Sequence, residues 1–162
     1  MKKESEDFKE VMKRFATGIC VVTTKTDDQI NGMTATAVSS LSMEPPLLIV
    51  CIDIKNRSHE LIKKSSAFAV NVLSVDQRES SNIFATPGKD KSEYLQRLET
   101  FTRSTGSPII KDSIAYLDCL LWSVYDGGDH SIFVGEVVDS GTLSDDPPLL
   151  YFNGDYHSLA GS

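Results

Sequence analysis

Short apolar runs of strand length recur along the whole chain, and no long amphipathic helix separates one run from the next. Such runs, rich in β-branched side chains and bounded by turn residues, are typical of β-strands. The two longest are joined by Asp126-Gly127-Gly128-Asp129, a good hairpin turn. Strands at this spacing, with only short helices, predict a mainly β protein with a closed or nearly closed antiparallel barrel. The expected strands are Ile19–Thr24, Ile30–Val38, Leu47–Ile54, Phe68–Val72, Ala115–Tyr125, His130–Ser140 and Leu149–Phe152.

Helical segments are few and short. An apolar stripe near the amino terminus recurs at helical spacing, which predicts a helix whose apolar face lies in a core or an interface. Its members are Phe8, Val11, Met12 and Phe15. Segments 58–64 and 77–85 are also expected to be helical, the second with Ile83 and Phe84 directed inward. The charged segment 86–107 is expected to cross the surface, and its sequence indicates no function.

Segment 30–59 carries most of the residues that could hold a ligand. Small side chains in its first part let a flat ligand approach the backbone, and hydroxyls can bond a polar ring edge or a phosphate. These residues are Gly32, Thr34, Ala35, Thr36, Ala37, Ser39, Ser40 and Ser42. An apolar strand follows Pro45-Pro46, and Asn56-Arg57-Ser58-His59 then resembles a helix start, where free N–H groups favour an anion. A ring cradle, an apolar wall and a phosphate pocket in this order predict a site for flavin mononucleotide.

Other interpretations of this segment stay open from the residues alone. The Thr-Ala-Thr alternation at 34–36 also fits an ordinary strand. Ser39 and Ser40 could cap a turn instead of bonding a ribityl chain or a phosphate. Either Asn56 or Ser58 could cap the following helix, which is compatible with a phosphate at the same helix start.

The order of these motifs resembles the short-chain flavin reductase family, whose domain is an FMN-binding split barrel of Greek-key topology. The resemblance rests on residues 32–37, the serines behind them, Pro45-Pro46 and Asn56-Arg57-Ser58-His59. Later matches are Gly128-Asp129-His130, Phe133-Val134-Gly135-Glu136-Val137, Pro147-Pro148-Leu149-Leu150-Tyr151 and Gly154-Asp155-Tyr156. Because the resemblance extends from Phe8 to about Leu159, one domain over residues 1–162 is expected.

The resemblance implies an NAD(P)H-dependent flavin reductase, similar to the reductase components of two-component aromatic monooxygenases. Such an enzyme reduces FMN or FAD with NADH or NADPH, needs no protein acid or base, and supplies reduced flavin to a separate oxygenase. The implied flavin-binding residues are Met33, Thr34, Ala35, Thr36, Ser39, Ser40, Val50, Cys51, Ile52, Asn56, Ser58 and His59. The implied nicotinamide-binding residues are His130, Tyr151 and Tyr156. Related reductases are dimers, so a homodimer is expected.

Two other functions fit the same residues. One is a flavoredoxin-like, flavin-binding electron carrier that does not turn over nicotinamide nucleotide. The other is a non-catalytic split-barrel module that binds another ligand or a protein. No GxGxxG fingerprint is present, so the sequence does not predict a Rossmann unit for the nicotinamide nucleotide.

Charge limits the possible partners. The formal net charge of −7 argues against a nucleic-acid partner, because phosphate backbones require clustered cations. A local exception is segment 55–64, which contains four cations and one anion, Glu60. The cations are Lys55, Arg57, Lys63 and Lys64. This basic island suggests an anionic small ligand, although helix surfaces also carry such charges for solubility.

Cysteine usage and the absence of long apolar runs indicate a cytoplasmic protein. Cys20, Cys51 and Cys119 lie in separate apolar runs and are expected to be free, buried thiols in a reducing compartment. No apolar run approaches the roughly 20 residues needed to span a membrane. The three histidines are widely spaced, so no zinc site is predicted.

Overall fold

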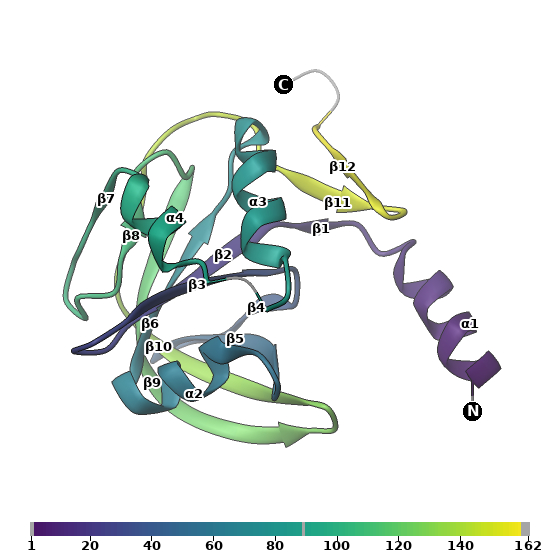
Figure 1. Ribbon diagram of the computed structural model, residues 1–162, viewed down its shortest axis with the longest axis horizontal. Helices are drawn as coiled ribbons and strands as arrows, with labels where there is room; N and C mark the ends of the chain where they lie inside the picture. The colour runs from purple at the N-terminus through teal and green to yellow at the C-terminus, as the bar shows by residue number, and fades with distance from the viewer. Residues whose placement is uncertain (1, 89, 160–162) are drawn as a thin grey trace.

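A seven-stranded antiparallel sheet forms the centre of the computed structural model, which describes residues 2–88 and 90–159 (Figure 1). The strand order is β3-β2-β6-β9-β10-β5-β4. The strands are β2 (Cys20–Lys25), β3 (Ile30–Ala35), β4 (Val38–Met43), β5 (Pro46–Asp53), β6 (Ala67–Val72), β9 (Ala115–Gly127) and β10 (His130–Thr142). This arrangement confirms the prediction of a mainly β, antiparallel architecture.

The two edge strands of this sheet are consecutive in the chain. Among the described strands, β3 pairs with β2 alone and β4 pairs with β5 alone, and only Thr36 and Ala37 join β3 to β4. The prediction of one strand over 30–38 is therefore wrong, because the chain leaves one edge at Ala35 and enters the other at Val38. The Cys51 N–H donates to the Ala37 carbonyl across this junction, with N and O 3.0 Å apart. We call residues 34–38 the seam of the barrel.

Three helices pack against the edge strand β3. Helix α2 (Arg57–Ser65) contacts β2 and β3, and helices α3 (Arg78–Ala85) and α4 (Ser92–Arg97) also contact β3. A 3-10 turn, η1 (Val75–Gln77), precedes α3. The two expected helices are confirmed. Within segment 86–107, α4 and β7 (Thr100–Phe101) were not predicted, nor was the strand β8 (Ile109–Ile110) that pairs with β7.

Packing between α3 and β3 explains one of the small residues in the seam region. A Cβ atom added at Gly32 would lie 2.6 Å from the ring of Phe84, which is buried on α3. Gly32 therefore makes room for a helix, and the interpretation that it makes room for a flat ligand is wrong. Ile83, the other residue expected to point inward from α3, is only half-buried.

The amino-terminal helix α1 (Lys2–Met12) stands apart from the barrel (Figure 1). Its apolar stripe is not in the core, since Phe8, Val11 and Met12 are 65%, 67% and 47% exposed. Phe15, just beyond the helix end, is 68% exposed. Of the two expectations for this stripe, core or interface, the first is wrong.

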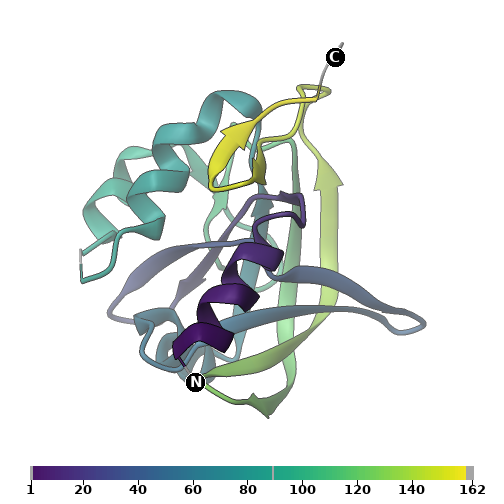
Figure 2. The ribbon, with the colours of Figure 1, turned by 90° about the vertical axis from the view of Figure 1, so that its right-hand side faces the viewer.

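Two further elements complete the fold. A small sheet of β1 (Thr17–Gly18), β11 (Leu150–Phe152) and β12 (Asp155–His157) pairs the first strand of the chain with the last two. The β4–β5 hairpin projects from the barrel as an arm (Figure 2), with Leu41 and Met43 exposed on it. Within residues 2–88 and 90–159, no helix combines the length and the apolar character that a membrane span requires.

Candidate functional site

Three surface hollows adjoin one another around the seam. Thr36 lines two of them, and Ala85 at the end of α3 lines one of these and the third. The edge strands β3 and β4 have no second partner among the described strands, so backbone groups on the open side of the seam can bond a ligand. The seam is thus an opening in the barrel wall, and three hollows with different linings adjoin it.

The first hollow, which we call the anion pocket, has a volume of about 640 Å³. Its charged lining consists of three cationic and two anionic side chains, and Asn31 and Asn56 add amide groups. The charged residues are Lys55, Arg57, Lys91, Asp53 and Asp90. The pocket therefore has an excess of positive charge in a protein whose net charge is negative.

Lys91 distinguishes this pocket from an ordinary charged surface. The residue is only 7% exposed, and its ammonium makes no ion pair or hydrogen bond with any other described residue. Burial lowers the pKa of Lys91 from its ordinary value. Arg57, by contrast, donates to Gln29 over 2.9 Å and lies 4.0 Å from a carboxylate oxygen of Asp90. The stem of Lys91 is buried while its ammonium still opens to the pocket, so Lys91 is a partly desolvated cation that is free to pair with an anionic ligand.

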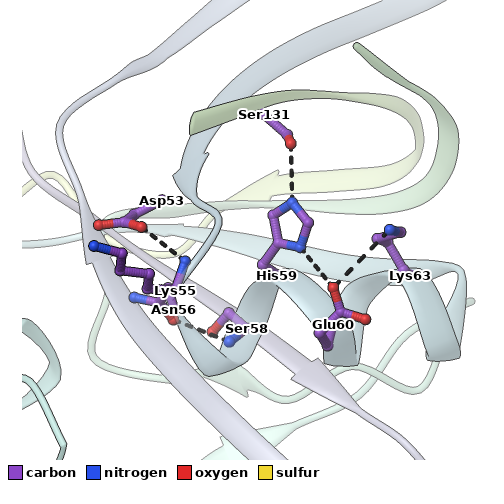
Figure 3. Close-up of polar contacts among 8 residues, drawn as sticks. All are labelled: Asp53, Lys55, Asn56, Ser58, His59, Glu60, Lys63 and Ser131. Carbon is purple, nitrogen blue, oxygen red and sulfur yellow. Dashed lines mark hydrogen bonds and ion pairs between the residues drawn. The ribbon is translucent and has the colours of Figure 1, made fainter. Parts of the chain in front are cut away.

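The start of helix α2 forms the floor of the anion pocket (Figure 3). Asn56 is the N-cap, and its side chain accepts the Ser58 N–H over 2.9 Å. The Ser58 hydroxyl is fully buried and accepts a hydrogen bond from the Asn31 amide over 2.8 Å. The cap alternative is thereby settled in favour of Asn56, and the Ser58 hydroxyl holds the helix against β3.

The second hollow, the polar hollow, has a volume of about 490 Å³ and lies between α3 and the hairpin β11–β12. Thr34 and Thr36 of the seam line one side of it, and Tyr151 and Tyr156 line another. The Tyr156 hydroxyl forms hydrogen bonds of 2.9 Å with the Ser81 hydroxyl and with the Asn82 amide oxygen. The structure therefore brings four of the predicted site residues into one cavity.

The third hollow, the apolar hollow, has a volume of about 640 Å³ and lies where α1 and β1 approach β4 and β5. Met12 and Phe15 line it together with Thr36, Ser39 and Cys51. Cys51 is half-buried, so the prediction that all three cysteines are buried is wrong for this one. Cys20 also lines the hollow, and burial raises the pKa of its thiol to about 12.

Several residues predicted to bind flavin direct their side chains into the core instead. Met33 and Ala35 are each 6% exposed, and Val50 and Ile52 are fully buried. Only the backbones of these four residues remain available to a ligand. Ser40 is exposed on β4, opposite Leu48, and lies outside the linings of the three hollows.

His59 is also a structural residue in this fold (Figure 3). Its ring is 6% exposed and meets the ring of Phe133 edge-on at a centroid distance of 5.1 Å. Nδ1 lies 3.0 Å from a Glu60 carboxylate oxygen, and Nε2 lies 2.9 Å from the Ser131 hydroxyl. Because the carboxylate can only accept, Nδ1 carries a proton, and the ring joins α2 to β10 without lining a hollow.

His130 is placed near the anion pocket rather than the polar hollow. It is the first residue of β10 and pairs with Asp53, which lines the anion pocket. Nδ1 lies 2.7 Å from an Asp129 carboxylate oxygen, and this hydrogen bond lowers the pKa of Asp129. His130 therefore lies beside the anion pocket, whereas Tyr151 and Tyr156 line the polar hollow. All three were assigned to one nicotinamide site.

Residues 12–160 match the protein family described as flavin reductase like domain. The chain belongs to this family. It is 40% identical over 157 residues to the reductase subunit HsaB of a flavin-dependent monooxygenase from Mycobacterium tuberculosis, covering 94% of this chain and 81% of that one. It is 30% identical over 162 residues to an NADH-dependent FAD reductase of Streptomyces globisporus, covering 98% of this chain and 87% of that one.

Solved structures of flavin reductases share the fold. A putative flavin reductase from Haemophilus somnus is 34% identical, with a TM-score of 0.91 over 95% of this chain and 98% of that one. The predictions of the split-barrel fold and of a member of the flavin reductase family are therefore confirmed. The relatives are named as reductases, so the prediction of an enzyme class, with flavin and nicotinamide nucleotide as its ligands, is confirmed at the level of the family.

Lys91 and Arg78 line the hollows but were not identified from the sequence. Lys91 lies in the charged segment 86–107, where a buried lysine cannot be told from exposed ones by composition. The available signal was Pro87-Gly88 directly after a helix, which turns the chain back towards the start of α2. No local sequence pattern marked Arg78 as a site residue, because its ion-pair partner Asp155 lies in a hairpin far along the chain.

Proposed function

We propose that this chain is an NAD(P)H:flavin oxidoreductase that reduces FMN or FAD and supplies reduced flavin to a separate monooxygenase component. The observation that carries the proposal is Lys91, a largely buried lysine whose ammonium reaches the anion pocket without an ion-pair partner among the described residues, beside an open barrel seam. Flavin nucleotides combine a phosphate with a flat, polar-edged ring, and the anion pocket and the seam offer one complement for each. The relatives named above support the same class of reaction.

The residues around the seam fit a flavin nucleotide. Lys91 would bind the flavin phosphate, with Arg57 and the α2 start beside it. Thr34 and Thr36, together with the backbone of residues 35–37, would bond the polar edge of the ring, and Cys51 would border it. Bound flavin supplies the redox chemistry by accepting a hydride at N5 from the C4 position of the nicotinamide.

The protein's contribution to this reaction is positioning and exclusion of water. Tyr151 and Tyr156 are aromatic side chains on the wall of the polar hollow opposite the seam, where a nicotinamide nucleotide can lie against the flavin. Their ring centroids are 5.7 Å apart, so the two rings support each other. No side chain need exchange a proton in this step, and proximity of the two bound rings accounts for catalysis.

The proposal also covers the partner protein, the cellular location and the domain organisation. A separate oxygenase partner is supported by the name of the Mycobacterium tuberculosis relative, a reductase subunit. A cytoplasmic location is supported by the three cysteines, all of which are free. We further propose that residues 1–162 act as one domain, since the first strand of the chain pairs with the last two in the sheet β1-β11-β12.

We propose that the protein is a homodimer. Besides the exposed stripe of α1, apolar residues are exposed on the projecting arm and on β9, and such surfaces are usually covered by a partner. Met43 on the arm is 88% exposed, and Trp122 and Tyr125 on β9 are 55% and 59% exposed. A second copy of the chain would cover α1 and close the outer side of the apolar hollow.

Loss of NADH absorbance in the presence of each flavin in turn tests the reaction. Turnover that depends on added FMN or FAD is expected. Binding of flavin without oxidation of NADH or NADPH would instead indicate an electron carrier. A protein that remains colourless and gains no thermal stability from either flavin would indicate a module with another ligand.

A further inference from the structure

The dipeptide Asn-Gly occurs twice in the chain, at Asn31-Gly32 and at Asn153-Gly154. This dipeptide is chemically labile, because the backbone nitrogen of the glycine can attack the side-chain amide of the asparagine. Glycine favours the reaction, since it has no Cβ atom to obstruct a close approach of the backbone. The two pairs share this local chemistry, so any difference in their reactivity comes from the fold.

The first pair is buried in the edge strand β3. Asn31 is 3% exposed, and its side-chain amide donates to the Ser58 hydroxyl over 2.8 Å. Gly32 is also buried and faces the ring of Phe84, where a Cβ atom would not fit. Both residues of the pair are in register with strand β2. Attack on the Asn31 amide therefore requires this part of the fold to open first.

The second pair forms the turn of the hairpin β11–β12 (Figure 1). Asn153 and Gly154 are both exposed, and both have positive φ, 52° and 85°. They are the two residues between Phe152 and Asp155, which pair across the turn. A Cβ atom added to Gly154 would meet nothing within 4 Å, so the side of this residue that a side chain would occupy is open.

The reacting groups of the second pair are free. Neither the side-chain amide of Asn153 nor the N–H of Gly154 has a hydrogen-bond partner within residues 2–88 and 90–159. The backbone N–H of Asn153, by contrast, donates to the Lys13 carbonyl over 2.7 Å. This bond holds the chain on one side of Asn153. It leaves rotation about the bond between Cα and the carbonyl carbon, which brings the Gly154 nitrogen towards the amide.

We propose that Asn153 is a site of spontaneous deamidation, and that its conversion to isoaspartate loosens the hairpin β11–β12. The Gly154 nitrogen forms a bond to Cγ of Asn153, and the bond from Cγ to the amide nitrogen breaks. Ammonia leaves with the proton of the Gly154 nitrogen, and a cyclic imide remains. Water then opens this imide. Addition of water at the main-chain carbonyl gives isoaspartate, and addition at Cγ gives aspartate.

Isoaspartate would disturb the hairpin in two ways. It directs the main chain through the former side chain, which adds a methylene group to a turn that fits the register of Phe152 and Asp155. It also adds a carboxylate two residues from Asp155, and like charges repel. Tyr151 and Tyr156 line the polar hollow from this hairpin, so the modification changes one wall of that hollow.

The test follows both Asn-Gly pairs in the purified wild-type protein during several days at mildly alkaline pH. Peptide mass spectrometry detects the exchange of an amide NH2 group for OH, and an isoaspartyl methyltransferase detects the isoaspartate. We expect Asn153 to react at least about tenfold faster than Asn31 in the folded protein, because the buried pair reacts only after local opening. In urea, where the fold is lost, the two rates should converge.

Asn153→Gly is the matched variant, because glycine accepts the positive φ of the turn and has no amide. Hydrogen exchange of the backbone amides in 150–157 should accelerate in the incubated wild type as isoaspartate forms, and should stay constant in incubated Asn153→Gly. Equal rates at Asn31 and Asn153 in the folded protein, or no reaction at Asn153, would overturn the site. Isoaspartate without faster exchange would overturn its effect on the hairpin. None of these measurements depends on the proposed reductase function.

Discussion

Nε2 of His59 lies 2.9 Å from the hydroxyl of Ser131, so helix α2 is fastened to strand β10 at the residue next to His130. The same helix begins at Asn56 on the floor of the anion pocket. The contact therefore fixes the pocket relative to the end of the β5–β10 ribbon. A histidine assigned to the ligand by its sequence motif thus also links two elements that surround the anion pocket.

Replacing His59 tests this structural role. His59→Ala should lower the free energy of unfolding by about 2–4 kcal/mol, because it leaves a cavity beside Phe133 and removes a buried hydrogen bond. His59→Gln should recover part of the loss by reaching Ser131. Urea unfolding measures both values, with the exposed His157→Ala as a matched control. An Ala variant as stable as the wild type would show that the contact contributes little.

Substitution of Lys91 should separate stability from ligand affinity. Lys91→Met should weaken binding of FMN by about tenfold to hundredfold, because a hydrogen bond to a charged group contributes about 1.5–3 kcal/mol. Riboflavin, which lacks the phosphate, should bind nearly as before. The ligand-free variant should be more stable than the wild type by about 1 kcal/mol at neutral pH, since a partly desolvated, unpaired charge has been removed. Equal losses for FMN and riboflavin would place the phosphate elsewhere.

The lowered pKa of Lys91 gives this affinity a pH dependence. In the ligand-free protein the ammonium loses its proton at a lower pH than an ordinary lysine does. Affinity for FMN should therefore begin to fall, as pH rises, before ordinary lysines titrate. The sign for folding is opposite: the unfolded chain binds this proton more tightly, so the stability of the ligand-free protein rises with pH through the same interval. Lys91→Met should remove both dependences, as titration calorimetry and unfolding at several pH values can show.

Bulky substitutions at the seam should block flavin without unfolding the barrel. Thr36 is exposed and lines both the polar and the apolar hollow. Thr36→Trp should abolish the increase in Tm that saturating FMN or FAD produces, and the Tm of the ligand-free protein should change little. Ser40→Trp is the matched control on the adjacent edge strand, outside the three hollows. A normal flavin-induced shift in Thr36→Trp would remove the seam from the proposed site.

Solution mass tests the proposed homodimer. Light scattering at micromolar concentration should give about twice the 17.8 kDa of one chain. Changing Phe8 and Val11 together to serine should shift the protein towards monomer, because the exposed stripe of α1 would lose its apolar character. Glu6→Ser, on the same helix, should leave the mass unchanged. A wild type that scatters as a monomer would contradict the proposal.

His130 is expected to contact the nicotinamide nucleotide without exchanging a proton. His130→Ala should raise KM for NADH several-fold, as loss of a hydrogen bond of about 0.5–1.5 kcal/mol implies, and leave kcat nearly unchanged. Flavin affinity should stay the same. Since His130 pairs with Asp53 at the anion pocket, the opposite pattern would assign it to the flavin instead: weaker flavin binding with an unchanged KM.

Segments with strong local signals were predicted well. The long pair β9 and β10, joined through Gly128, and the helices near 58–64 and 77–85 follow from alternation, turn residues and helical spacing. The break of the chain between Ala35 and Val38 had no local signal, because Thr36 and Ala37 are acceptable strand residues. Their position is set by which strands they join, which only the closed sheet determines.

The composition of the site was predicted better than its arrangement. Sequence order placed Thr34, Thr36, Tyr151 and Tyr156 at a ligand site, and the structure brings them into one hollow. Val50 and Ile52 were assigned backbone contacts with the flavin, and side chains that lie in the core are compatible with that prediction. Lys91 escaped notice because burial, not residue type, gives it significance.

The seam also bears on how the protein must be handled. A strand edge without a partner is a template for pairing with another chain, and a fully closed barrel avoids this hazard by having no edge. Here the edges of β3 and β4 stay open beside the hollows that would receive the ligand. Flavin kept in the buffers during purification and storage would therefore cover these strand edges and reduce aggregation, besides taking part in turnover.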